Sequence, residues 1–168
     1  MQKCDIILTH SRTFFGTIVR WILNFFQSDD VRYSHVLIVE NSETAVEANK
    51  TIRHTNIEKV LKSAKRYKIV RLKEITTNQQ EVILKEIYEN LGNDYSYWRA
   101  FLNLIDEVGD TSWFSKGAKY HTCSSFVSYL YEVGCQIEFN KTPWYACNPD
   151  DIDDHIIDND NWTIVGEK

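Results

Sequence analysis

The sequence predicts an α+β domain in which a mainly antiparallel sheet supports a helix that begins at a cysteine. Short runs of apolar and β-branched residues, separated by turn-forming residues, have the length of strands. A later segment, residues 121–134, carries apolar residues at helical spacing. The chain has 168 residues, of which 43% are hydrophobic, and this is enough for one core. We therefore expect a single domain over residues 1–168.

Five runs are expected as strands, at residues 4–9, 33–40, 44–48, 67–73 and 162–165. The run 33–40 is almost continuously apolar, which suits a strand covered on both faces. Residues 44–48 read as its antiparallel return, with the turn near residues 41–43. These two runs should therefore form a hairpin.

Capping residues indicate where several helices begin. Asn56 should cap a short helix, and the run 77–80 should form the capping box of a helix that ends at Gly92. Asn148 should cap another helix, whose first residue is Pro149.

A further amphipathic helix is expected at residues 13–26, with aromatic residues near one side. Such a helix covers one face of the sheet, and its excess of aromatic residues allows a second role as the wall of a substrate groove.

Charge and composition exclude some classes of partner. The net charge is −5, and no basic stripe interleaved with aromatic residues is present, so we expect no nucleic-acid partner. The longest apolar-biased stretch, 14–26, is too short for a membrane span. The chain opens without the pattern of a signal peptide, so a cytoplasmic protein, or one delivered without a classical signal, is expected. We also expect a monomer.

The four cysteines, Cys4, Cys123, Cys135 and Cys147, include no Cys-x-x-Cys pair. A chain of this size needs no disulfides, so free thiols in a reducing compartment are expected. Three of the cysteines together with His121 and His155 could be zinc ligands, but structural zinc sites usually bring their ligands in close pairs. We therefore expect no metal and no cofactor.

Cys123 is the candidate nucleophile because of its place in the predicted helix. Thr122 is the expected N-cap and Gly134 the expected residue after the helix, so Cys123 falls in the first turn, where free N–H groups stabilise a thiolate. The helical spacing puts the cysteine on the stripe of residues that faces the core, formed by Phe126, Val127, Leu130 and Tyr131. The alternative is that Cys123 is a small buried residue of the core with no catalytic role.

His35 and Glu47 are a candidate pair because they lie on the two strands of the predicted hairpin. A loop of residues 40–42 makes them direct cross-strand neighbours, and a loop of residues 41–43 makes them diagonal neighbours on the same face. In either case their Cβ atoms are about 4.5–8 Å apart, so the carboxylate could accept the imidazole N–H. A loop with an even number of residues would put them on opposite faces.

A cysteine nucleophile needs a base, and the base needs an orienting group, so Cys123, His35 and Glu47 form a candidate catalytic triad. His121, two residues before the cysteine, is the alternative base. A strand histidine with only a structural role is the alternative to both.

Several short motifs occur in a characteristic order, namely Asp5-Ile-Ile-Leu, Tyr33-Ser-His-Val-Leu-Ile-Val, Ala45-Val-Glu-Ala48, Thr122-Cys-Ser-Ser-Phe-Val127 and Asn148-Pro-Asp-Asp151. Together they resemble the YiiX-like, circularly permuted branch of the NlpC-type papain-like cysteine peptidases. The resemblance implies a permuted papain-like fold with the sheet first. It also implies Cys123 as nucleophile, His35 as general base and acid, and Glu47 as the orienting residue. The sequence departs from the family at Cys4 and Leu37, where glycine is usual or frequent.

The function expected is that of a cysteine amidase or peptidase that forms a thioester and acts on small peptide, amide or acyl substrates, including cell-wall peptides. Substrate contacts are expected from residues that flank the histidine and the cysteine, namely Tyr33, Ser34, Thr122 and Ser124. One alternative is a lipid acyl hydrolase or acyltransferase, similar to the lecithin retinol acyltransferase group. The other is a binding module that has lost activity.

Overall fold

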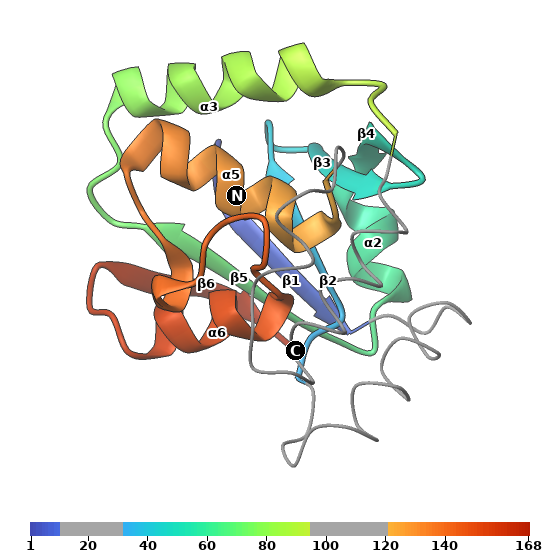
Figure 1. Cartoon of the computed structure of the whole chain (residues 1–168). Helices are drawn as coiled ribbons and strands as arrows, with labels where there is room; N and C mark the ends of the chain where they lie inside the picture. Colours follow the sequence, from blue (N-terminus) through green and yellow to red (C-terminus); the bar gives the residue numbers. More distant parts are fainter. Residues whose placement is uncertain (11–31, 95–120) are drawn as a thin grey trace.

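The computed structural model describes residues 1–10, 32–94 and 121–168, and these residues form an α+β fold built on one antiparallel sheet (Figure 1). The sheet has six strands in the order β4-β3-β2-β1-β5-β6. The α+β class and the antiparallel pairing expected from the sequence are confirmed. The helix expected at residues 13–26 lies outside the described residues.

The strands are β1 (Ile6–His10), β2 (His35–Val39), β3 (Thr44–Asn49), β4 (Thr51–Asn56), β5 (Arg66–Leu72) and β6 (Trp162–Glu167). All the strands expected from the sequence are present. The sequence pattern missed β4, which follows β3 after a turn at Lys50 with φ +64°. Because β4 is an edge strand, only Ile52 in it is buried, and its run of residues lacks the apolar content by which the other strands were found.

The helices in the described residues are α2 (Ile57–Ser63), α3 (Thr77–Asn90), α5 (Cys123–Cys135) and α6 (Pro149–Ile157), with a 3₁₀ turn η2 (Phe139–Lys141). The caps expected at Asn56 and Asn148 are confirmed. For α3 the capping box expected at residues 77–80 is wrong by one position. Thr76 is the N-cap and pairs with Gln79; both threonines have a glutamine three residues on, so the sequence pattern fits either start.

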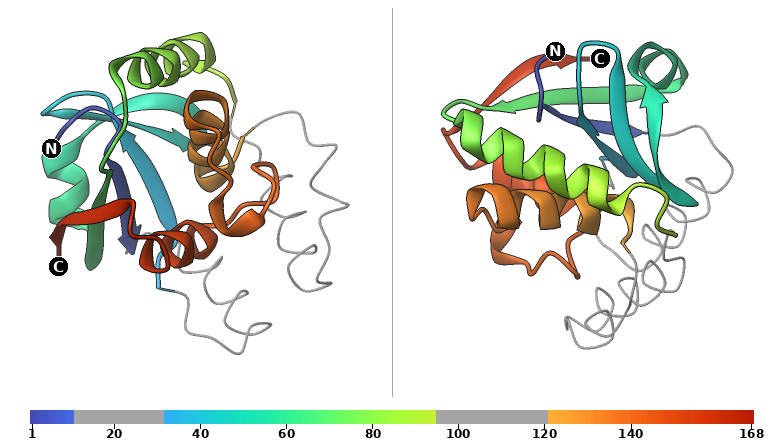
Figure 2. Two further views of the ribbon diagram at one scale, coloured as in Figure 1. Left: turned by 90° about the vertical axis from the view of Figure 1, so that its left-hand side faces the viewer. Right: turned by 90° about the horizontal axis from the view of Figure 1, so that it is seen from above.

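The sheet separates two hydrophobic clusters, with α3, α5 and α6 on one face and α2 on the other (Figure 2). Because successive side chains of a strand point to opposite faces of the sheet, neighbouring residues belong to different clusters. In β1, Ile6 and Leu8 point into the larger cluster with α5, whereas Ile7 points into the smaller cluster with α2. The sheet thus gives α5 a buried apolar surface to pack on.

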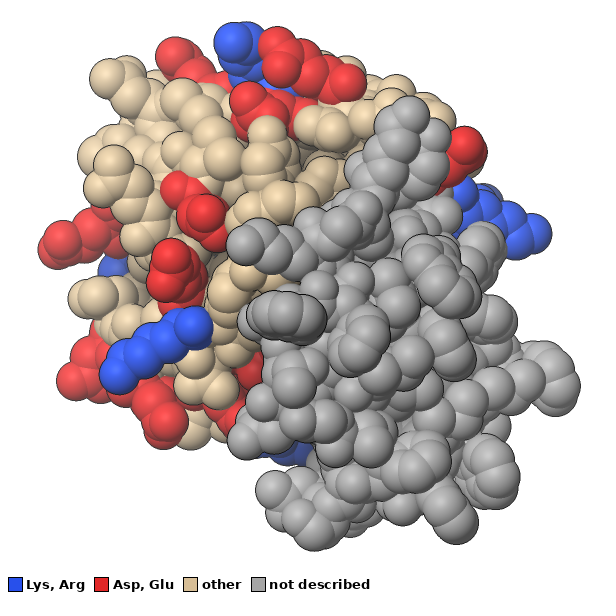
Figure 3. Space-filling view, in the orientation of Figure 1, with Lys and Arg blue, Asp and Glu red and all other residues tan. Residues whose placement is uncertain are grey.

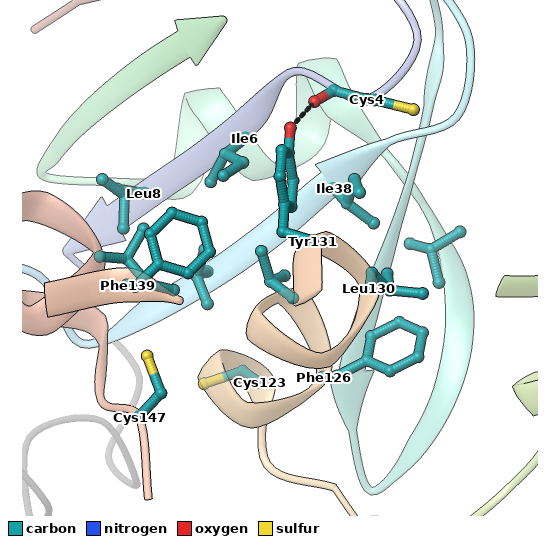
Figure 4. Close-up of a cluster of buried hydrophobic side chains, with 14 of the residues drawn as sticks. Cys4, Ile6, Leu8, Ile38, Cys123, Phe126, Leu130, Tyr131, Phe139 and Cys147 are labelled. Carbon is teal, nitrogen blue, oxygen red and sulfur yellow. Dashed lines mark hydrogen bonds between the residues drawn. The ribbon is translucent and has the colours of Figure 1, made fainter. Parts of the chain in front are cut away.

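Helix α5 is buried along most of its length, as its apolar stripe predicts. Figure 4 shows the Tyr131 side chain pointing towards the segment that leads into β1, where its hydroxyl donates to the Cys4 carbonyl. This contact fixes α5 to the start of the first strand. The first residue of α5, Cys123, is thereby held at a set position beside the sheet.

Gly134 does not follow the helix, as the sequence predicted, but lies inside its last turn. The residue in the left-handed conformation is Gln136, with φ +58°. A Cβ on Gly134 would lie 2.5 Å from Ile83 Cγ1 of α3. Gly134 is therefore suited to close packing between α5 and α3, and a sequence pattern does not distinguish that role from a helix end.

Acidic side chains are spread over the described part of the face in Figure 3, with a few Lys and Arg side chains between them. This distribution agrees with the net charge of −5. In the described ranges, no helix is both long and apolar enough to cross a membrane.

Candidate active site

The β2–β3 hairpin brings His35 and Glu47 together. Ile38 pairs with Val46 and Val39 with Ala45, so the loop is residues 41–43, and His35 and Glu47 are diagonal neighbours on the same face. Asn41 fixes this loop, because its Oδ1 accepts the N–H groups of Glu43 and Thr44, each at 3.0 Å. His35 Nε2 lies 2.8 Å from Glu47 Oε2. The odd-loop geometry predicted from the sequence is therefore the observed one.

Helix α5 supplies Cys123 to the same site. Thr122 caps the helix in a capping box with Ser125, so Cys123 is the first helical residue. The thiol is hydrogen-bonded to His35 and also receives the backbone N–H groups of Val36 and Ser124. Because His35 Nε2 is engaged by Glu47, the nitrogen left for Cys123 is Nδ1. One imidazole therefore joins the carboxylate to the thiol.

The charged forms of Cys123, His35 and Glu47 stabilise one another. Burial alone would lower the pKa of His35, but the Cys123 thiolate and the Glu47 carboxylate outweigh burial and raise that pKa to about 10. Burial alone would raise the pKa of the Cys123 thiol, but the positive charge of His35 and the hydrogen bonds to the sulfur lower it. The arrangement favours a thiolate–imidazolium pair over a neutral thiol and imidazole.

Glu47 has a second partner, which the sequence interpretation did not include. Arg53, directly opposite Glu47 in the β3–β4 ladder, donates from Nε at 3.1 Å and from Nη2 at 2.8 Å to Glu47 Oε1. Burial raises the pKa of Glu47, but the hydrogen bonds and charges of His35 and Arg53 lower it overall. Recognition of β4 after the turn at Lys50 would have revealed this pair.

Comparison with known proteins supports the fold. No protein-family model matches the chain, and no curated protein matches it. Among solved structures, the metalloprotein YiiX from Escherichia coli O157:H7 is similar, with a TM-score of 0.68 and 16% sequence identity over 99% of this chain and 97% of that chain. The chain has a YiiX-like fold. At this identity the similarity concerns the fold alone.

Within this YiiX-like fold, the residues expected to contact substrate all lie within two positions of His35 or Cys123 in the chain. Thr122 and Ser124 are buried: Thr122 caps α5, and Ser124 Oγ donates to the Cys147 carbonyl at 2.7 Å. The Ser34 N–H donates to the Thr9 carbonyl at 3.0 Å. Tyr33 is buried, with Lys68 Nζ 5.4 Å from the centre of its ring. Contact of these four residues with substrate stays a prediction.

His121, the alternative base, lies among aromatic rings. Its ring centre is 5.1 Å from that of Tyr129 and 5.2 Å from that of Trp144. Since His35 is the imidazole hydrogen-bonded to the Cys123 thiol, the geometry favours His35 over His121 as the base.

The four cysteines are all free. Burial raises the pKa of Cys4 to about 12 and that of Cys135 to about 11, in contrast to the lowered pKa of Cys123. The Cys123 thiol thus differs from the thiols of Cys4 and Cys135, whose pKa values are raised.

Proposed function

We propose that this chain is a cysteine hydrolase of the permuted papain-like type, which cleaves amide bonds through a triad of Cys123, His35 and Glu47. One observation carries the proposal: His35 contacts Glu47 Oε2 at 2.8 Å and also hydrogen-bonds the thiol at the start of α5. A nucleophile, a base and a group that orients the base are the parts that acyl transfer to cysteine requires.

In the proposed reaction the Cys123 thiolate attacks the substrate carbonyl, and the resulting oxyanion accepts the backbone N–H of Cys123 at the helix start. His35 then gives its proton to the leaving amine as the C–N bond breaks, which leaves a thioester on Cys123. His35 next takes a proton from water, and the hydroxide formed attacks the thioester. Collapse of that intermediate releases the acid and restores the thiolate–imidazolium pair.

The Escherichia coli neighbour is described as a metalloprotein. In the described part of this chain, no group of three or more His, Cys, Asp and Glu side chains is arranged to hold a metal ion. Every step above uses the chain's own groups.

The substrates we propose are small peptides and related amides, including cell-wall peptides. Acyl esters of lipids are the competing class, because a thiolate attacks both kinds of carbonyl. A panel of short peptides, simple amides and lipid esters distinguishes the two classes by the ratio of kcat/KM for amides to that for esters.

The proposal is tested by labelling and by substitution. At pH 7, iodoacetamide should alkylate Cys123 at least about tenfold faster than Cys135, since only the thiolate reacts. Cys123→Ala should abolish turnover of any substrate found in the panel and leave the unfolding transition in place, whereas Cys135→Ala should keep turnover. Equal alkylation rates of the two cysteines, followed by mass spectrometry, would contradict an activated thiolate.

A further inference from the structure

Arg53 and His35 bind different oxygens of the Glu47 carboxylate. Both Arg53 donors bind Oε1, at 3.1 and 2.8 Å, and His35 Nε2 lies 2.8 Å from Oε2. Rotation of the carboxylate group would break at least one of these contacts. Arg53 therefore fixes the oxygen that faces His35.

Arg53 also influences where the proton of the His35–Glu47 pair resides. The pair can be ionised, or it can be neutral with the proton moved to the carboxylate. The Glu47 side chain is only 7% exposed, and burial favours the neutral form. The hydrogen bonds of a guanidinium group are strongest to an ionised carboxylate. Arg53 thus favours the ionised pair, in which the proton stays on His35.

We propose that Arg53 is a positioning residue for the function proposed above, on which this inference rests: it holds Glu47 as an oriented carboxylate, so that His35 can stabilise the Cys123 thiolate. Arg53 acts through Glu47 and does not touch the reacting atoms. The groups that act most strongly on Glu47 are His35 from β2 and Arg53 from β4, and those that act on His35 are Glu47 from β3 and Cys123 from α5.

The positive charge of Arg53 also has an opposing effect, because it repels the imidazolium. This repulsion is weak, since the Arg53 side chain is 50% exposed and water screens its charge. The His35 side chain is only 20% exposed, so its hydrogen bond to Glu47 is screened less. Removal of Arg53 should therefore destabilise the imidazolium, because the loss of Glu47 orientation outweighs the loss of repulsion between Arg53 and His35.

The experiment measures the rate of alkylation of Cys123 by iodoacetamide across pH 4–9 in Arg53→Gln and Arg53→Lys, with mass spectrometry as the readout. In Arg53→Gln the apparent pKa of the Cys123 thiol should rise, and alkylation at pH 6 should slow by about tenfold. With a substrate from the panel, kcat should fall by about tenfold and KM should change less than about twofold. Arg53→Lys keeps the charge and should recover part of the loss.

Arg71 provides the matched control. It binds the buried Asp5 carboxylate with two hydrogen bonds, at 2.8 and 2.9 Å, on β5, two strands away from β2. Arg71→Gln should lower the unfolding temperature but leave the alkylation profile of Cys123 unchanged. A shifted profile in Arg53→Gln alone supports the proposal. An unchanged profile in Arg53→Gln, or the same shift in both variants, overturns it, because Arg53 would then be only a cross-strand partner.

The outcome for the wild-type protein separates this proposal from the function on which it rests. If wild-type Cys123 is alkylated no faster than Cys135, the cysteine hydrolase proposal fails, and the role of Arg53 fails with it. If wild-type Cys123 is selectively alkylated and Arg53→Gln is indistinguishable from it, only the role of Arg53 is wrong.

Discussion

The imidazole of His35 contacts one oxygen of the Glu47 carboxylate, at 2.8 Å, and this carboxylate acts together with the Cys123 thiolate to favour the imidazolium form. Glu47→Gln keeps the size of the side chain and one acceptor but removes the negative charge, so the imidazolium form of His35 should be less stable. The apparent pKa of the Cys123 thiol should then rise, and kcat should fall by about tenfold or more. The measurement is the pH profile of Cys123 alkylation together with turnover. If both match the wild type, Glu47 is not the third member of the triad.

The backbone of Cys4 lies in the left-handed region, which favours glycine. The residue has φ +65° and is only 2% exposed, so it combines a left-handed conformation with a buried side chain. Cys4→Gly and Cys4→Ala both remove the sulfur, but only alanine keeps the Cβ that is strained there. We expect the glycine variant to be more stable than the alanine variant by about 1 kcal/mol in urea unfolding. Equal stabilities would mean that the backbone at Cys4 is not strained.

At the scale of elements, the packing of α5 against α3 depends on Gly134. In Gly134→Ala the new Cβ would meet Ile83, which is fully buried and cannot move away. The expected cost is about 1–3 kcal/mol in spite of the better helix propensity of alanine. Gly166→Ala, whose nearest contact would be at 3.4 Å, is the control and should change stability by less than about 0.5 kcal/mol.

A double-mutant cycle tests this explanation. In an Ile83→Ala background the two close contacts with the Ile83 side chain are removed, and the Gln79 carbonyl oxygen at 3.4 Å is an ordinary contact, so Gly134→Ala should there stabilise the protein by about 1 kcal/mol. Chemical unfolding of the four proteins gives the coupling. If Gly134→Ala destabilises both backgrounds equally, contact with Ile83 is not the cause.

At the scale of the whole molecule, α6 is joined to the sheet by charged groups. Asp153 is buried between Lys68 of β5, at 2.5 Å, and Arg32, at 3.1 Å. Asp150, one turn earlier in α6, accepts the Tyr33 N–H at 3.3 Å, just before the strand that carries His35. The segment that leads into β2 is therefore joined to α6 by a hydrogen bond to Asp150.

Asp150 should make the stability of the protein depend on pH. Burial raises its pKa to about 6, so the folded protein holds this proton more tightly than the unfolded chain does. The resulting stability is complete below about pH 4, the ordinary value for aspartate, and is lost as the pH rises through about 6. Asp150→Asn, which keeps an acceptor for Tyr33, should therefore be more stable than wild type at pH 7.5 by about 1 kcal/mol and should lose this advantage near pH 4.

Urea unfolding at several pH values checks this dependence. Asp150→Ala, which removes the acceptor, should be less stable than Asp150→Asn throughout the range. An asparagine variant that is less stable than wild type at pH 7.5 would show that the ionised carboxylate stabilises the fold.

Local sequence patterns were enough to predict most strands and several helix starts. Alternating and continuous apolar runs predicted all the strands of the described residues except β4. Capping residues predicted the starts of α2, α5 and α6. The pairing of His35 with Glu47 was also predictable, because the register of a hairpin follows from the length of its loop.

Features that join segments distant in sequence could be established only from the packing of the folded chain. The edge strand β4, and with it Arg53, could not be found by its apolar pattern, because an edge strand buries few side chains. The contact of Cys123 with His35, and the role of Gly134 against Ile83, depend on how α5 packs on the sheet and on α3. Periodicity in a sequence fixes which face of an element is buried, but only packing fixes which partner covers that face.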